Sequence, residues 1–244
     1  FVVAVLMGIC AMILSGTRSS WLAGIAVFFI AMFFYLDRYS ISRQILVSLV
    51  LMGGIAIVSS TVPLVQKRID TMIEIVTPYV EGEDQTSYNS LRYRVEIWKL
   101  GLQLGMDNKV FGYGPGYTKK KIKEYAQQYP QFAGLARLNH IHNQYIQTFA
   151  MTGLVGVISL LVMVGCHFWL FAKYLPKRYS TEVRSLALAG ILMLVSYLIY
   201  SIAAIPFIGR HHLMMYGFAS ATIWGSLLGA LRNPASDGQV ESVT

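Results

Sequence analysis

Long apolar stretches alternate with shorter polar segments along this chain of 244 residues. A helix needs about 20 mostly apolar residues to cross the hydrocarbon core of a bilayer. We predict membrane-spanning helices, the first of them truncated, over residues 1–15, 19–36, 44–62, 143–172, 185–206 and 211–231. The pattern therefore predicts an all-α integral membrane protein, built as a multi-span helical bundle.

The same pattern divides the chain into four parts. We predict three membrane helices in 1–62, a polar segment with interfacial helices over 63–142, three membrane helices in 143–231, and a disordered tail over 232–244. The chain opens on Phe1 within an apolar run, without an initiator methionine. We therefore expect a fragment with further membrane helices upstream.

Basic residues in the short loops predict the orientation of the bundle. They gather on one side: Arg38, Arg43, Lys173, Lys177, Arg178, Arg184 and Arg232. Short cytoplasmic loops are enriched in Lys and Arg, whereas long loops are exempt from this bias. The sequence thus places these loops in the cytoplasm and the 63–142 segment outside it, in the periplasm of a Gram-negative cell.

Composition agrees with a membrane protein, because hydrophobic residues make up 55% of the chain, charged residues only 13%, and the mean hydropathy is +0.52. A soluble domain is nearer a quarter charged. The net charge of +8 reflects topology first and an anionic lipid or phosphate substrate second, so nucleic acid is not indicated.

Cys10 and Cys166 lie in apolar stretches without metal or redox spacing, and we predict no metal site and no cofactor.

The polar segment is predicted to be mostly helical. Residues 63–79 suit an amphipathic interfacial helix, 81–89 a loop, and 90–106 a helix on which Arg94 and Trp98 share a face. The run Phe111-Gly-Tyr-Gly-Pro-Gly116 predicts a tight turn. Because no strand precedes it, a dinucleotide loop is not supported, although backbone amides facing a phosphate remain an alternative.

Two histidines, His140 and His142, lie where the polar segment meets the apolar stretch that starts at residue 143. Titratable side chains at a membrane rim are costly to keep and point to function. Histidine also transfers protons near neutral pH. This pair favours a membrane enzyme over a scaffold.

Four motifs occur in a characteristic order. They are Thr17-Arg18-Ser19, Arg94-x-x-x-Trp98, Phe111-Gly-Tyr-Gly-Pro-Gly116, and His142-Asn143 followed after nine residues by Gly153-x-x-Gly156. This set resembles the O-antigen ligase and polymerase superfamily of bacterial inner membranes. The pattern around His142 looks most like the ligase branch.

The resemblance implies a fold and an activity. It implies a helical membrane fold like that of glycosyltransferase-C enzymes, an inverting and metal-independent reaction, and an active site that faces the periplasm. Such enzymes transfer a glycan from undecaprenyl diphosphate to the lipid A–core oligosaccharide. The implied partners are that donor, that acceptor and membrane lipids.

This chemistry assigns roles to the candidate residues. Arginine binds phosphate oxygens bidentately and stays charged, so Arg18 and Arg94 suit the leaving diphosphate. A neutral histidine suits the removal of the acceptor's proton, which makes His142 the candidate general base. Residues that could join them are His140, Arg92 and Arg210.

Each candidate also has a purely structural explanation. Arg18 could reach the interface as an ordinary boundary residue. Arg94 could pair with Glu96 or Asp107 at the surface, and His142 could cap a helix or contact lipid headgroups. For Gly153 and Gly156 we favour close helix packing, and His167 is expected to be a packed core residue.

Three functional alternatives stay open. An O-antigen polymerase or a protein O-glycosylation ligase would use the same donor, and a polyprenyl-glycan transporter or flippase would belong to another class. A transporter predicts internal repeats and charged or broken helices at the midplane, and the sequence shows no clear repeat. Carboxylates at Glu81, Glu83 and Asp84 could hold Mg²⁺, but the resemblance argues against this.

Overall fold

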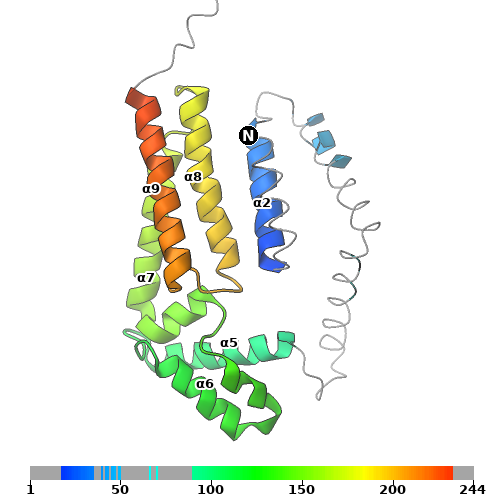
Figure 1. The fold of residues 1–244 in the computed structure, drawn as a ribbon, viewed down its shortest axis with the longest axis vertical. Helices are drawn as coiled ribbons and strands as arrows, with labels where there is room; N and C mark the ends of the chain where they lie inside the picture. The colour runs from blue at the N-terminus through cyan, green and yellow to red at the C-terminus, as the bar shows by residue number, and fades with distance from the viewer. Residues whose placement is uncertain are drawn as a thin grey trace, which may run out of the picture. The chain divides into compact units, whose positions relative to one another are not determined.

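The computed structural model describes residues 18–35, 40, 42–43, 45–47, 49–50, 66 and 70, and the continuous stretch 90–232. All regular elements in these parts are helices, as predicted (Figure 1). They are α2 (Arg18–Tyr35), α5 (Ser90–Asp107), α6 (Tyr117–Gln128), the 3-10 helix η1 (Pro130–Arg137), α7 (Gln144–Ala172), α8 (Thr181–Tyr200) and α9 (Arg210–Arg232). The predictions for 1–15, 44–62, 63–89 and the tail lie largely or wholly outside the described residues.

The chain forms two compact units. Unit 1 comprises Phe1–Ala31 and Val157–Thr244, and unit 2 comprises Met32–Gly156. Within the described residues, three helices are long and apolar enough to cross a membrane, namely α7, α8 and α9. The apolar stretch of α2, Leu22–Phe34, is shorter than these.

The ends of α8 differ from the predicted span 185–206. The helix begins at Thr181 because the Ser180 hydroxyl accepts a hydrogen bond from the Val183 amide at 3.3 Å, an N-cap that the apolar pattern does not register. It ends at Tyr200, and Pro206 follows in the turn that leads to α9. Hydropathy alone overestimated the helix at this end, because residues 202–206 are apolar but lie in the turn that leads to α9.

In unit 1 the three long helices run side by side (Figure 1). Their common core consists of Phe171, Val183, Ala187, Ile191, Leu227 and Ala230. His167 on α7 joins the other two helices, since its Nε2 lies 3.1 Å from the Gly190 oxygen on α8 and its Nδ1 lies 2.7 Å from the Tyr216 hydroxyl on α9. His167 is thus packed between helices, as expected.

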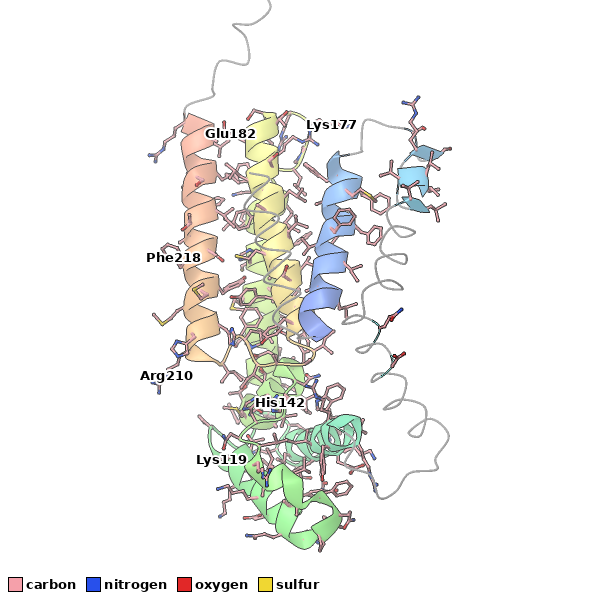
Figure 2. The ribbon with its side chains drawn as sticks, turned by 45° about the vertical axis from the view of Figure 1, so that its right-hand side comes forward. Lys119, His142, Lys177, Glu182, Arg210 and Phe218 are labelled. Carbon is pink, nitrogen blue, oxygen red and sulfur yellow. The ribbon has the colours of Figure 1, made fainter. Side chains whose placement is uncertain are left out.

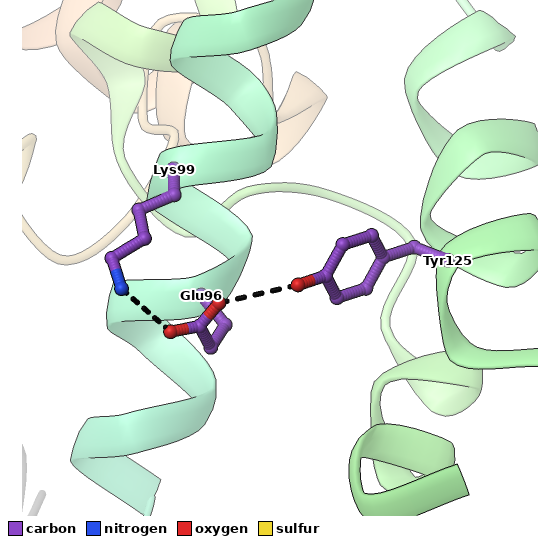
Figure 3. Close-up of polar contacts among 3 residues, drawn as sticks. All are labelled: Glu96, Lys99 and Tyr125. Carbon is purple, nitrogen blue, oxygen red and sulfur yellow. Dashed lines mark hydrogen bonds and ion pairs between the residues drawn. The ribbon is translucent and has the colours of Figure 1, made fainter. Parts of the chain in front are cut away.

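Unit 2 is built around α5, which packs against α6, η1 and the first turns of α7. The buried core comprises Ile97, Leu100, Leu104, Ile122, Ala126, Phe132, Leu135, Ile141 and Ala150. At the surface, Glu96 on α5 accepts hydrogen bonds from Lys99 at 2.8 Å and from the Tyr125 hydroxyl of α6 at 3.2 Å (Figure 3). The bond from Tyr125 joins α6 to α5.

Helix α7 is broken at Gly153, where φ is 61° and ψ is −157°. The break frees the carbonyls of residues 150 and 151 and the amides of residues 154 and 155, which would bond to each other in a continuous helix. The glycine-rich loop takes their place: Tyr113 N and Gly114 N donate to the two carbonyls at 3.1 and 2.8 Å, and the oxygens of Lys109 and Val110 accept from the two amides at 2.7 and 3.2 Å. The loop therefore completes the hydrogen bonding of α7.

Two glycines make this insertion possible. A Cβ on Gly153 would lie 2.6 Å from the Phe111 nitrogen, and one on Gly112, where φ is 62°, would lie 2.5 Å from Met151 backbone atoms. The expectation that Gly153 packs against another helix is wrong, because Gly153 meets the loop backbone. The atoms nearest to a Cβ on Gly156 belong to Thr152 and Thr148 of its own helix. The tight turn predicted at 111–116 is confirmed. The Gly112, Tyr113 and Gly114 amides are bonded to backbone carbonyls, so these three do not face a phosphate.

Candidate active site

The two histidines lie together in unit 2, immediately before the first turn of α7. Their ring centroids are 4.1 Å apart and the ring planes are tilted by 46°. His142, labelled in Figure 2, is half-buried. Its φ is 57°, the only positive φ outside glycine in the part of the chain that the structure describes. Non-glycine residues rarely adopt this conformation, and such residues cluster at functional sites.

The residues on either side of His142 are buried and anchored. Asn143 caps α7, since its Oδ1 accepts hydrogen bonds from the amides of Tyr145 and Ile146 at 3.0 and 3.1 Å. Ile141 has no exposed surface and packs in the core of unit 2. The structural explanation that His142 caps the helix is therefore wrong. An asparagine directly before an apolar helix is itself a capping signal.

The surroundings of His142 keep its imidazole neutral. Burial, the neighbouring His140 and the positive charge of Arg94 together lower the pKa of His142 from 6.5 to about 4. Burial also lowers the pKa of His140. At neutral pH the His142 ring consequently carries a free lone pair, as a proton acceptor requires.

Arg94 and His142, which the sequence analysis assigned to one site, both lie in unit 2. Arg94 lies on α5 with its side chain exposed, close enough to His142 for its charge to lower the pKa of the imidazole. The alternative pairing of Arg94 with Glu96 is not observed, because the Glu96 carboxylate binds Lys99 and Tyr125 instead (Figure 3). Arg94 takes part in none of the ion pairs within the described stretch 90–232.

The other predicted arginines have different surroundings. The Arg92 guanidinium lies 5.1 Å from the centre of the Phe132 ring, a cation–π contact that joins α5 to η1. Arg210 is the exposed first residue of α9 in unit 1. Arg18 is the first residue of α2, and its side chain is not among those described. Roles for Arg18 and Arg210 at the site remain predictions.

Metal ligation was tested on the described residues only. Among them, no group of three or more His, Cys, Asp or Glu side chains is arranged to hold a metal ion. The carboxylates Glu81, Glu83 and Asp84 lie outside the described residues.

Fold and site together define a class: a helical membrane protein whose polar helical unit carries a neutral histidine beside an exposed arginine. Residues 2–161 match the family described as O-antigen ligase, and the chain belongs to that family. It is also 26% identical over 202 residues to a protein of Haemophilus influenzae described only as uncharacterized. That alignment covers 81% of this chain and 49% of the relative, so the chain spans about half of the relative's length.

Proposed function

We propose that the protein transfers O-antigen polysaccharide from undecaprenyl diphosphate to the lipid A–core oligosaccharide, at the periplasmic face of the bacterial inner membrane. Membership of the O-antigen ligase family supports a ligase or polymerase type of reaction. The observation that carries the proposal further is the neutral imidazole of His142 beside the Arg94 guanidinium. One group accepts a proton and the other stabilises a diphosphate.

The reaction follows from these two groups. The imidazole of His142 takes the proton of the acceptor hydroxyl as its oxygen attacks the anomeric carbon of the donor sugar. The bond between that carbon and the phosphate oxygen breaks with inversion, and the diphosphate leaves with the bonding electron pair. Arg94 stabilises the negative charge that develops on it. Arg18 and Arg210 are proposed as further cations for the diphosphate.

The bound donor also adjusts the strength of the base. A pKa of about 4 leaves His142 unprotonated but makes it a weak base near neutral pH. An anionic diphosphate beside the ring favours the protonated form and offsets the positive charge of Arg94, so donor binding raises the pKa. The substrate thereby brings His142 closer to the pKa that proton transfer requires.

The acceptor is tested by reconstitution. The full-length protein in proteoliposomes receives a glycan on undecaprenyl diphosphate, with or without purified lipid A–core. A ligase forms glycan-modified lipid A–core only when the acceptor is present. Elongation of one donor glycan by another, without acceptor, would identify a polymerase. Transfer to a serine or threonine peptide would identify a protein ligase.

A transporter is tested in the same vesicles. Movement of the labelled donor from one leaflet to the other, without any new glycosidic bond, would identify a flippase and contradict the proposal. The predicted result is a new bond, which mass spectrometry of the lipid A–core product detects.

A further inference from the structure

A buried glutamine holds the backbone between the two histidines. Gln147 lies on the first turns of α7 and is 3% exposed. Its Oε1 accepts a hydrogen bond at 2.8 Å from the amide of Ile141, the residue between His140 and His142. The glutamine thus pairs the backbone N–H of Ile141, which would otherwise be buried without an acceptor.

The other end of the same side chain is also fixed. Gln147 Nε2 donates to the Thr118 hydroxyl on α6 at 3.3 Å and lies 2.7 Å from the Met151 sulfur on α7. Thr118 is itself 3% exposed. These contacts determine which end of the amide faces Ile141, so the histidine segment is connected to two helices through one side chain.

This connection bears directly on the conformation of His142. A positive φ at a histidine is unfavourable and persists only when its surroundings impose it. On one side Asn143 is held by its cap on α7, and on the other side Ile141 is held by Gln147. Removing the second anchor leaves a buried amide unpaired and allows the segment to relax.

We propose that Gln147 is a positioning residue that, together with Thr118, holds Ile141 and thereby keeps His142 in its left-handed conformation beside His140 and Arg94. The consequence for glycan transfer rests on the proposed function, whereas the effect on the His142 ring does not. The charged or titratable groups known to act on that ring are His140 and Arg94, and both disfavour its protonation. A ring released toward water would therefore regain protons at a higher pH.

The test uses the full-length protein in lipid nanodiscs. Gln147→Met keeps the size of the side chain and removes its amide, and Thr118→Val and Thr118→Ser remove and retain the hydroxyl. Thr222→Val is the control, because its hydroxyl donates only within α9, to Phe218 at 2.9 Å. The readouts are thermal stability, the pKa of His142 from imidazole NMR, and kcat and KM for the donor.

For Gln147→Met we expect the pKa of His142 to rise from about 4 toward its ordinary 6.5. We also expect kcat to fall about tenfold or more while KM for the donor stays nearly constant, because small misplacements of a catalytic group cost this much. Thr118→Val should shift both quantities in the same direction by less, Thr118→Ser should restore them, and Thr222→Val should change neither.

A folded Gln147→Met protein with the wild-type His142 pKa and kcat would overturn the proposal. If this variant does not fold, the Thr118 pair decides: identical His142 pKa values in the Val and Ser variants would overturn it. A shifted pKa in a protein whose His142→Ala variant still transfers glycan would uphold the positioning role and refute the proposed function of His142.

Discussion

At the scale of single residues, the site depends on a histidine held in an unfavourable backbone conformation. His142 has a φ of 57°, and such residues cost on the order of 1–3 kcal/mol. The cap at Asn143 and the buried Ile141 supply the constraints that maintain it. We propose that this conformation holds a half-buried, neutral imidazole at a fixed position near Arg94.

Arg94 is expected to act through the shape as well as the charge of its guanidinium. Arg94→Lys keeps the charge but loses bidentate phosphate binding, so transfer should fall about 10- to 100-fold, the range expected for one charge-assisted hydrogen bond of about 1.5–3 kcal/mol. Arg94→Gln should in addition raise the pKa of His142, because a positive charge that lowers it is removed.

Arg137→Lys is the matched control for Arg94, since Arg137 is an exposed arginine on η1 of the same unit and is not a candidate for the site. Both activities are measured as initial rates of glycan transfer at saturating acceptor. Equal rates for Arg94→Lys and Arg137→Lys would reduce Arg94 to an ordinary surface residue.

The pH dependence should separate the free protein from its donor complex. Protonated His142 has no lone pair, so activity is lost as the pH falls through its pKa. For kcat/KM, which reports the free protein, this loss is expected near pH 4. For kcat, which reports the complex, it should occur at a higher pH, because the bound diphosphate raises the pKa. Pre-steady-state and steady-state pH profiles measure the pH at which kcat/KM and kcat are lost. If kcat were lost at a lower pH than kcat/KM, the proposal that the donor raises the pKa of His142 would be contradicted.

Sequence reasoning proposed His142 and Arg94 from a motif and from the chemistry of diphosphate transfer, and in the structure the charge of Arg94 contributes to lowering the pKa of His142. It did not find Gln147, because a glutamine on an apolar helix carries no signal of its partner. That partner is a backbone amide set by the tertiary fold. The same limit applies to Arg92, whose contact with Phe132 depends on how α5 meets η1.

At the scale of helices and loops, the break in α7 is the main feature. The loop between α5 and α6 replaces the hydrogen bonds that Gly153 interrupts. Sequence predicted the turn correctly and the role of Gly153 wrongly. A glycine in an apolar helix suits either close helix packing or a break, and only the position of the loop backbone distinguishes them.

Alanine at either glycine of this insertion should destabilise unit 2. Gly153→Ala and Gly112→Ala would force a Cβ against backbone atoms at 2.6 and 2.5 Å. Overpacking of this kind costs about 1–3 kcal/mol, and the positive φ adds about 1–3 kcal/mol for a residue with a Cβ. Hydrogen exchange at the amides of Leu154 and Val155, which donate to the loop, should accelerate in both variants.

Gly165→Ala is the control within the same helix. Nothing lies within 4 Å of a Cβ at that position, and Gly165 is not among the residues with positive φ. Replacing it should leave the exchange of Leu154 and Val155 unchanged. The proposed insertion would be refuted if the Gly153 and Gly165 variants exchanged alike.

At the scale of the whole molecule, the prediction of a helical membrane protein is confirmed for the described parts, since α7, α8 and α9 are each long and apolar enough to span a bilayer. Hydropathy found these helices because burial in lipid requires long apolar runs. It missed the start of α8, where the Ser180 cap extends the helix to Thr181, and it overestimated the end of that helix. The orientation depends on charge in the short loops and remains a prediction.

That orientation predicts the labelling of engineered cysteines. In a protein whose Cys10 and Cys166 are replaced by alanine, Lys119→Cys should react with a membrane-impermeant maleimide in intact spheroplasts. Lys177→Cys should react only after permeabilisation. Both lysines are exposed, and α7 lies between them in the chain. The opposite pattern would place the site on the cytoplasmic face.

The central claim is that His142 removes the proton of the acceptor hydroxyl, and one substitution tests it most directly. His142→Ala and His140→Ala in the full-length protein are compared for glycan transfer to lipid A–core and for donor binding. We predict that His142→Ala abolishes transfer while folding and donor binding persist, and that His140→Ala retains measurable transfer. Wild-type transfer by a folded His142→Ala protein would contradict the assignment.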